Sequence, residues 1–255
     1  CFVNIKEKYM RYNELTFQGR NAVLEAFRSG KTIDKLFILD GCQDGPIKSI
    51  VREAKKTDAI INYVDKERLD RLAGTGHHQG VVAIGAAYEY AEVEDILAAA
   101  KEKGEDPFIF ILDEIEDPHN LGAIIRTANL AGAHGVIIPK RRAVGLTATV
   151  AKTSAGAINY TPVAKVTNIS QTIEELKKQG LWFVCADMGG ETMYNLNLKG
   201  PIGLVIGNEG NGVSRLVKDK CDFIASIPMK GDIDSLNASV AAGVLAYEIV
   251  RQRLN

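Results

Sequence analysis

The sequence has no apolar run that approaches the roughly 20 residues of a membrane-spanning helix, and its first residues show no signal-peptide pattern. Internal repeats and low-complexity segments are also absent. Cysteine is scarce: Cys1, Cys42, Cys185 and Cys221 are scattered without C-x-x-C spacing, which argues against a disulfide framework and against a zinc site. We therefore expect reduced thiols, a cytoplasmic location and no bound metal.

Strong charge of either sign is lacking as well. The formal net charge is −1, which by itself does not indicate a nucleic-acid partner. Residues 1–87 carry 14 Lys and Arg against 11 Asp and Glu, whereas residues 88–255 carry the remaining 17 against 21. The modestly basic first part permits the binding of a polyanion without requiring it. The chain has 255 residues, and domains usually have about 100–150, so the chain can form either one large domain or two smaller ones.

The first part of the chain predicts an alternating α/β unit. Residues 1–16 mix polar and aromatic residues without a clear period, and we expect a mobile leader there. Beyond it, hydrophobic periodicity predicts helices near 19–27, 47–54 and 66–73, and strands near 36–39, 59–64 and 81–86. Residues 88–106 are rich in charge and predict a linker that contains a short helix near 93–102.

The second part predicts a mainly parallel sheet covered by helices, because apolar runs alternate with helical patterns. Strands are expected at 108–112, 135–139, 160–166, 181–187, 202–206 and 222–227, and helices at 123–131, 147–155, 168–179 and 213–219. A last helix, 237–254, is apolar nearly all round. Such a helix is buried on more than one side, against the sheet or against a second subunit.

Residues 203–214 form the clearest candidate site. Leu204, Val205 and Ile206 fit a buried strand that stops abruptly at the sequence Gly-Asn-Glu-Gly-Asn-Gly, residues 207–212. Three glycines in six residues permit positive φ and a close approach of the backbone to a ligand. We expect a ligand site here, because open α/β sheets bind ligands at the carboxyl ends of their strands.

A phosphate-binding loop is one interpretation of this glycine pattern. The spacing G-x-x-G-x-G is neither the Rossmann fingerprint nor a Walker loop, however. Glu209 would also repel an anion. A neutral or cationic ligand held by backbone groups fits better, with a simple tight surface turn as the alternative.

Two further segments carry polar residues in apolar surroundings. Arg126 falls within an otherwise small and apolar helix, where a guanidinium needs a partner or a pocket; an ordinary ion pair is the alternative. In residues 227–241 a strand ends at Pro228, a polar loop follows, and Ser235 or Asn237 can cap the last helix.

The adjacent His77 and His78 are a weak metal candidate. Neighbouring residues on a loop rarely point at one ion, and no further Cys or His clusters nearby. A loop that contacts RNA or a partner is the better interpretation.

Taken together and in this order, the three segments closely resemble the motifs of the SpoU/TrmH class of SPOUT RNA methyltransferases. The matching patterns are Asn120-x-Gly122-x-x-x-Arg126-Thr-Ala128, residues 204–214, and Ile227-Pro-Met followed by Ser235-Leu-Asn-Ala-Ser-Val240. In the first part, Gly19-x-x-Ala22-Val-x-Glu-Ala26 and His78-Gln-Gly-Val-Val82 are similar to the small domain, related in fold to ribosomal protein L30e, that presents the RNA.

The resemblance implies an α/β chain of two domains. An L30e-like α/β domain that binds the RNA substrate would span 1–87, a linker 88–106, and a methyltransferase domain 107–255. The latter would have a mainly parallel sheet and a C-terminal trefoil knot, a topology too rare to propose from sequence patterns alone. The class pairs its knot domains, so a homodimer is expected, in agreement with the apolar last helix.

The cofactor implied by the resemblance is S-adenosyl-L-methionine, held in the knot. Its sulfonium is a cation and its adenine is neutral, which agrees with a glycine loop that carries Glu209. The residues expected to bind it are Leu204, Ile206, Gly207, Asn208, Gly210, Ile227, Pro228, Met229, Ser235, Leu236 and Asn237.

The reaction implied is transfer of a methyl group to a ribose 2′-hydroxyl, a weak acid that a base or a charge relay should assist. The resemblance assigns that role to Arg126. Because arginine keeps its charge in proteins, we expect it instead to hold a phosphate, to stabilise the developing alkoxide, or to pass a proton through the phosphate. Asn120, Glu209, Ser235 and Asn237 would orient substrate and cofactor.

The combination of both domains suggests the ribosomal-RNA members, which make 2′-O-methylguanosine, with the P-site loop of 23S ribosomal RNA as the best candidate. Relatives modify uridine or adenosine elsewhere. Candidate RNA contacts are Arg20, Lys140, Arg141 and Arg142, with a solvated charged surface as the alternative. A non-catalytic RNA-binding or ribosome-assembly factor is the second hypothesis, and a dinucleotide-dependent enzyme, disfavoured by the glycine spacing, is the third.

Overall fold

A computed structural model describes residues 16–57, 59–74, 77–232 and 235–254. The chain forms two compact units. One comprises the chain up to Glu89 together with residues 145–148, and the other comprises Tyr90–Val144 and the chain from Thr149 onward. In the part of the chain that is described, no helix is long and apolar enough to cross a membrane.

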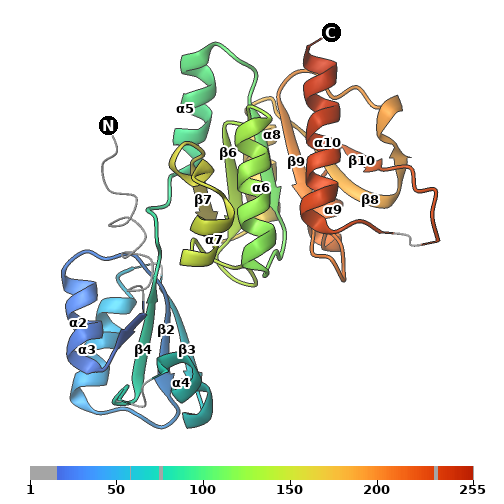
Figure 1. The fold of residues 1–255 in the computed structure, drawn as a ribbon. Helices are drawn as coiled ribbons and strands as arrows, with labels where there is room; N and C mark the ends of the chain where they lie inside the picture. Colours follow the sequence, from blue (N-terminus) through green and yellow to red (C-terminus); the bar gives the residue numbers. More distant parts are fainter. Residues whose placement is uncertain (1–15, 58, 75–76, 233–234, 255) are drawn as a thin grey trace. The chain divides into compact units, whose positions relative to one another are not determined.

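The first unit is a three-layered α/β fold (Figure 1). Its sheet has the order β1 (Thr16–Gln18), β4 (Val81–Gly85), β2 (Ile33–Leu39) and β3 (Ile60–Val64), in which only the β2–β3 pair is parallel. Helices α2 (Arg20–Arg28) and α3 (Gly45–Ala54) cover one face, and α4 (Lys66–Ala73) covers the other. The alternating helices and strands expected from periodicity are confirmed.

Local signals explain where these helices begin. Asp44 caps α3 by accepting a hydrogen bond from the backbone N of Ile47 at 3.2 Å, and Asp65 caps α4 through the backbone N of Arg68 at 2.7 Å. A mobile leader is expected at 1–16, and residues 1–15 of it lie outside the described residues. The expectation is wrong for its last residue, because Thr16 begins strand β1 and pairs with Ile84.

The second unit contains a six-stranded sheet in which every pair of neighbouring strands is parallel, which confirms the expected sheet. Parallel strands end at a common edge, so the segments that follow them are brought together there. The order is β10 (Phe223–Ser226), β8 (Trp182–Thr192), β9 (Ile202–Ile206), β5 (Phe108–Leu112), β6 (Gly135–Pro139) and β7 (Val163–Val166).

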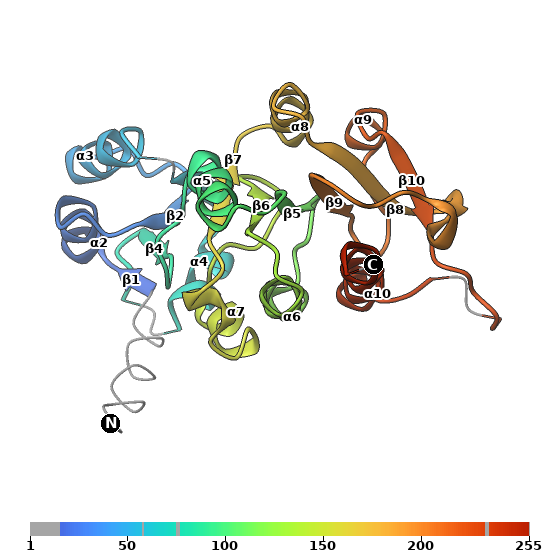
Figure 2. The same cartoon turned by 90° about the horizontal axis from the view of Figure 1, so that it is seen from above.

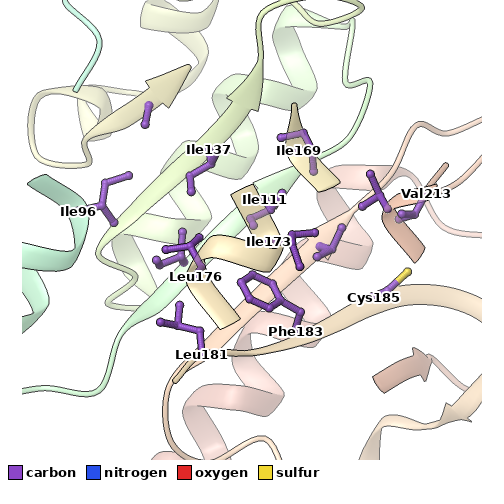
Figure 3. Packing of buried hydrophobic residues seen from close by; sticks show 14 residues of the cluster. Ile96, Ile111, Ile137, Ile169, Ile173, Leu176, Leu181, Phe183, Cys185 and Val213 are labelled. Atoms are coloured by element: carbon purple, nitrogen blue, oxygen red, sulfur yellow. The ribbon is translucent and has the colours of Figure 1, made fainter. Parts of the chain in front are cut away.

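Helices cover both faces of this sheet (Figure 2). On one face, α5 (Val93–Lys103), α8 (Ile169–Lys177) and α9 (Arg215–Lys218) pack on the strands. Figure 3 shows the core beneath them, where Ile111, Ile137 and Phe183 of three strands meet Ile173 and Leu176 of α8. On the other face lie α6 (Pro118–Leu130), which packs against α10 (Ala238–Arg253), and the short α7 (Ala148–Thr153).

Two element boundaries differ from expectation by five residues, and β2 and β7 begin three residues from the expected positions, at Ile33 and Val163. Helix α6 begins at Pro118 and not at 123, because Asp117 caps it through the backbone N of His119 at 2.9 Å and proline suits the first helical turn. Strand β8 continues to Thr192 and not to 187, with a bulge in its pairing: Ile224 pairs with Cys185 but the next residue, Ala225, pairs with Glu191. The trefoil knot stays a prediction.

A buried histidine anchors the start of the central strand β5. The side chain of His134 is fully buried; its Nδ1 accepts a hydrogen bond from the backbone N of Phe108 at 3.0 Å, and its Nε2 lies 3.1 Å from Glu105. An Nδ1 that accepts this bond cannot carry a proton, so the neutral ring fits the site. Burial lowers the pKa of His134 below its ordinary 6.5; Glu105 opposes this, and the charges of Lys103 and Arg253 add to the lowering.

We predict that this histidine makes the second unit less stable in mild acid. As the pH falls below about 6.5, the unfolded chain binds the proton first, so the stabilisation is complete above that pH and is lost as the pH falls through the lower folded pKa. Replacement His134→Ala should cost about 1–3 kcal/mol at neutral pH by leaving the Phe108 amide unpaired, and should reduce the pH dependence. Urea unfolding at pH 7.5 and 5.5 measures both, with His119→Ala, an exposed position, as the control. An unchanged pH dependence in His134→Ala would contradict the assignment.

Candidate functional site

Three segments that are distant in the sequence meet through their side chains. Asn120, in the first turn of α6, donates a hydrogen bond from Nδ2 to Oε1 of Glu209 at 2.6 Å. Asn237, at the start of α10, donates from its Nδ2 to Oδ1 of Asn120 at 3.1 Å and also to Oε1 of Glu209. We call these three residues the Asn–Glu–Asn triad. It joins the three segments that the sequence singled out.

The other end of Asn237 is also engaged. Its Oδ1 accepts hydrogen bonds from the backbone N of Ser239 at 2.9 Å and of Val240 at 3.4 Å, so Asn237, and not Ser235, is the side chain that caps α10. The amide is therefore held from both sides. The carboxylate of Glu209, whose direction the sequence left open, points to the two asparagines.

The glycine-rich loop after β9 closes on its own backbone. Asn208 and Gly212 exchange two backbone hydrogen bonds of 3.1 and 2.8 Å. A Cβ at Gly207 would lie 2.1–2.3 Å from backbone atoms of Gly212 and Val213, so only glycine fits at this position. Buried Asp113, directly after β5, accepts a hydrogen bond from the backbone N of Ser214 at 2.8 Å and closes the far end of the loop.

A cavity of about 380 Å³ lies against this loop. This is within the range of small-molecule sites, which occupy roughly 300–1,000 Å³. Its walls come from the bulge in the middle of β8, the glycine loop, β10 with the segment after it, and the start of α10 with the loop before it. The lining residues are Ala186, Asp187, Met188, Ile206, Gly207, Asn208, Glu209, Gly210, Asn211, Gly212, Ala225, Ile227, Met229, Ser235, Leu236, Ala238 and Ala241.

The charge of the cavity is negative. Asp187 and Glu209 line it, and none of its described lining residues is a lysine or an arginine. Burial raises the pKa of Asp187, but hydrogen bonds from Lys218 at 2.8 Å and from the backbone N of Gly189 at 2.9 Å outweigh it, and the pKa lies below its ordinary value. Asp187 therefore stays ionised at neutral pH, and a wall that carries carboxylates and no cation favours a cationic or neutral ligand over a phosphate.

Arg126 stands apart from these residues. It is exposed on α6 and does not line the cavity. Among the residues that the structure describes, no carboxylate lies within ion-pair distance of its guanidinium, so the alternative of an ordinary structural ion pair finds no support. The guanidinium is thus available to a ligand or a partner chain.

Most residues expected to bind a cofactor line the cavity, with three exceptions. Leu204 is fully buried within β9, Asn237 belongs to the triad, and Pro228 is exposed; none of the three is among the lining residues. The positions expected at Ile206, Gly207, Asn208, Gly210, Ile227, Met229, Ser235 and Leu236 all line it.

The four candidate RNA contacts differ in their surroundings. Arg20 pairs with Asp44 at 2.5 Å and donates from Nε to the carbonyl of Gln79 at 3.2 Å, so it also holds the first unit together. Arg142 pairs with Glu114 at 2.9 Å, which holds its pKa above the ordinary value. Lys140 is half-buried, and Arg141 is exposed.

His77 and His78 lie in different surroundings. His78 is buried, accepts a hydrogen bond on Nδ1 from the backbone N of Gly80 at 3.0 Å, and places Nε2 2.9 Å from Asp70 of α4. It is therefore a structural anchor of its loop, whereas His77 is exposed. Within the described ranges, no group of His, Cys, Asp and Glu side chains is placed to hold a metal ion.

Sequence reasoning missed two parts of the site. One is Asp113, which could have been noticed as a carboxylate directly after a buried strand. The other is the bulge at residues 186–190 of β8, which brings Asp187 and Met188 to the cavity. The adjacent glycines 189 and 190 were its only signal: a Cβ at Gly190 would lie 2.3 Å from the carbonyl oxygen of Ile224.

Comparison with known proteins matches both parts of the chain to known families. The family model described as the SpoU rRNA Methylase family matches residues 107–247, and the model described as RNA 2'-O ribose methyltransferase substrate binding matches residues 18–91. The "Putative TrmH family tRNA/rRNA methyltransferase YacO" of Bacillus subtilis is 53% identical over 236 residues, which cover 92% of this chain and 94% of the relative. A relative from Staphylococcus haemolyticus with the same TrmH description is 49% identical over 241 residues, covering 94% and 96%.

Solved structures show the same fold. The SpoU methyltransferase AviRb from Streptomyces viridochromogenes, in complex with the cofactor AdoMet, has a TM-score of 0.60 at 24% identity, covering 98% of this chain and 94% of AviRb. The A. aeolicus TrmH/SpoU tRNA modifying enzyme has a TM-score of 0.53 at 29% identity, covering 59% and 77%.

Fold, site and comparisons together define an α/β protein of the SpoU/TrmH class of RNA methyltransferases. The chain belongs to the SpoU rRNA methylase family, and the resemblance drawn from its three motifs is confirmed.

We predict that Gly207 cannot be replaced without loss of the loop. In Gly207→Ala the new Cβ would meet backbone atoms that cannot move aside, and the free energy of unfolding should fall by about 1–3 kcal/mol. The matched control is Gly210→Ala, where the nearest atom to a Cβ is the side-chain oxygen of Asn208 at 3.4 Å. Denaturant unfolding of both variants tests this, and equal stability of the two would contradict it.

Proposed function

We propose that this protein transfers a methyl group from S-adenosyl-L-methionine to a ribose 2′-hydroxyl of RNA. The observation that carries the proposal is the Asn–Glu–Asn triad, which holds the three family motifs together beside a cavity of negative charge. Family membership supports the reaction class, and the match of residues 18–91 to a 2'-O ribose methyltransferase substrate-binding model supports a ribose target.

The residues present fit the cofactor. The cavity is lined by residues of the glycine loop and by apolar residues such as Ala225, Ile227 and Leu236, among which a planar neutral base and an aliphatic chain would find room. The carboxylates of Asp187 and Glu209 suit a sulfonium cation and an ammonium group, and they disfavour a dinucleotide phosphate. When bound, the cofactor supplies an electrophilic methyl group.

The chain's own groups would position the substrate and accept its charge. The residues of the cavity would hold the cofactor, which would supply the methyl group to the ribose O2′ and keep the electron pair of the broken carbon–sulfur bond on sulfur. The hydroxyl proton would pass to the nucleotide phosphate or to water. The charged guanidinium of Arg126 would hold the phosphate of the nucleotide or stabilise the developing alkoxide. The triad, with Ser235 on the cavity wall, would keep the incoming ribose in line, and positioning of this kind supplies a large part of such catalysis.

We propose ribosomal RNA as the substrate, with a guanosine in the P-site loop of 23S ribosomal RNA as the target. The presence of a substrate-binding unit beside the methylase unit supports this choice. Mass spectrometry of ribosomal RNA from a strain that lacks the gene, compared with the complemented strain, identifies the nucleotide. A missing methyl on uridine, on adenosine or on transfer RNA would keep the chemistry and change the target.

A non-catalytic RNA-binding or ribosome-assembly role is the second candidate function. The intact triad weighs against it, and so does Arg126, which is exposed and has no ion-pair partner among the described residues, because RNA binding alone does not require these groups. Calorimetry with S-adenosyl-L-methionine separates the two: tight RNA binding without cofactor binding would support the second candidate.

We predict that Arg126 acts in the chemical step. Arg126→Ala should lower kcat by about 10²–10³-fold, the usual effect of losing one charge-stabilising donor, while the Kd for the cofactor stays unchanged because Arg126 does not line the cavity. Methyl transfer from labelled cofactor to unmodified ribosomal RNA measures the first, and calorimetry the second. The control is Arg215→Ala, whose side chain is 93% exposed. A near wild-type rate in Arg126→Ala would contradict the role.

We also propose a homodimer through the surface formed by α6 and α10. These helices pack together near Thr127 and Gly243, yet they leave large apolar side chains exposed: Leu130, Val240, Tyr247 and Leu254. Arg126 is one turn from Leu130 on α6, so a second chain on this surface would also cover the guanidinium.

The dimer is tested by light scattering at micromolar concentration, where the mass should be twice the 27.7 kDa of the chain. Val240→Glu together with Tyr247→Glu should produce a monomer, because two charges would be buried in an apolar contact. Tyr194→Glu, at an equally exposed tyrosine of another segment, should leave the dimer intact. A monomeric wild type would contradict the proposal.

A further inference from the structure

A hollow in the first unit is not explained by the site described above. It has a volume of about 400 Å³ and lies along α3 beside the strand β3, in the part coloured blue in Figure 1. We call it the cationic hollow. It is lined by Cys42, Gln43, Ile47, Lys48, Val51, Arg52, Lys55 and Tyr63.

The floor and the rim of the cationic hollow differ in chemistry. Ile47 is buried, and Val51 and Cys42 are half-buried, so the floor is apolar. The rim carries Lys48, Arg52 and Lys55, which are all exposed and follow one another at spacings of four and three residues along α3 and its end. No acidic residue lines the hollow among the described residues.

The nearby carboxylates leave this positive charge largely uncompensated. Glu53 pairs with Lys56 at 2.8 Å, and its distance to Arg52 is 3.9 Å, at the outer limit of an ion pair. Asp44 pairs with Arg20. None of the described residues forms an ion pair with Lys48 or Lys55.

An aromatic ring completes the hollow. Tyr63 is 55% exposed, which is high for a tyrosine within a strand. Side chains alternate along a strand, and Ile61 packs in the core under α2 and α3, so Tyr63 faces the same side. Because β3 has β2 as its single neighbour in the sheet, Tyr63 stands at the open edge beside α3.

A polyanion with flat apolar faces matches this combination. Proteins bind single-stranded nucleic acid by placing lysine and arginine along the backbone and stacking bases on exposed aromatic rings. A protein partner of acidic character would use the cations but would not require the exposed ring over an apolar floor. The first part of the chain also has the excess of positive charge, +3 over residues 1–87, that such a partner needs.

We propose that the cationic hollow is a subsite for a single-stranded segment of the RNA, in which one base stacks on Tyr63 and the neighbouring phosphates meet Lys48, Arg52 and Lys55. The inference rests on the proposed function, since it takes RNA as the substrate. It adds a contact surface on α3 and β3 that is distinct from Arg20, whose guanidinium is already occupied by Asp44 and Gln79.

The experiment measures binding of a fluorescent single-stranded RNA oligonucleotide to the full chain at several salt concentrations. Tyr63→Leu should weaken binding by roughly five- to a hundred-fold, the range for loss of one stacked base, with the salt dependence unchanged. Tyr63→Phe keeps the ring and should bind as the wild type does. The triple change Lys48→Gln, Arg52→Gln and Lys55→Gln should lower the slope of log Kd against log salt by about 2, since each phosphate contact contributes roughly 0.7 on a single strand.

A matched triple variant controls for net charge. Lys66→Gln, Arg68→Gln and Arg71→Gln remove the same charge from exposed positions of α4, on the opposite face of the same sheet, and should leave binding and slope near the wild type. Equal effects of the two triple variants, or unchanged binding in Tyr63→Leu, would overturn the subsite. Methyl transfer by the wild type is assayed in parallel. If the wild type transfers methyl groups but the hollow variants bind RNA as the wild type does, the subsite is wrong and the proposed function stands. If the hollow variants lose RNA binding but the wild type transfers no methyl group, the proposed function is wrong and the subsite stands.

Discussion

The carboxylate of Glu209 accepts hydrogen bonds from the side-chain amides of Asn120 and Asn237, and the arrangement of the site depends on this contact. Asn120 is 89 residues before Glu209, and Asn237 is 28 residues after it. Because Asn237 also caps α10, the bond ties the first turn of that helix to the glycine loop and to the start of α6. Asn120 is buried, so its side-chain amide would cost free energy if the exposed Glu209 and Asn237 moved away and left it unpaired.

The parallel sheet makes this contact possible. All six strands run the same way, so the segments after β5, β8, β9 and β10 emerge at one edge. There the glycine loop closes on its own backbone: Gly207 admits the close return of the chain, and Asp113 holds the far end of the loop. The carboxylates of Asp187 and Glu209 line the cavity at this edge, where a negative charge suits a cation better than a phosphate.

The two units differ in the charge that they gather on their surfaces. The cavity in the second unit contains acids, whereas the surface of the first unit gathers cations along α3. A chain with a net charge of −1 can therefore serve an RNA substrate, because local charge and not the total decides the contact. Arg126 is exposed on α6 and forms no ion pair with any residue that the structure describes.

The sequence alone determined the elements, the family and most residues of the cavity. Strands at 108–112 and 202–206 were placed correctly because their apolar runs are short, continuous and bounded by glycine or charge. Tertiary structure decided which groups touch: the direction of Glu209, the use of Asn237 as the cap of α10, the position of Arg126 outside the cavity, and the bulge that brings in Asp187. The reason is physical. Periodicity records which side of an element is buried, whereas a hydrogen bond between residues 120 and 237 depends on how the strands between them are ordered.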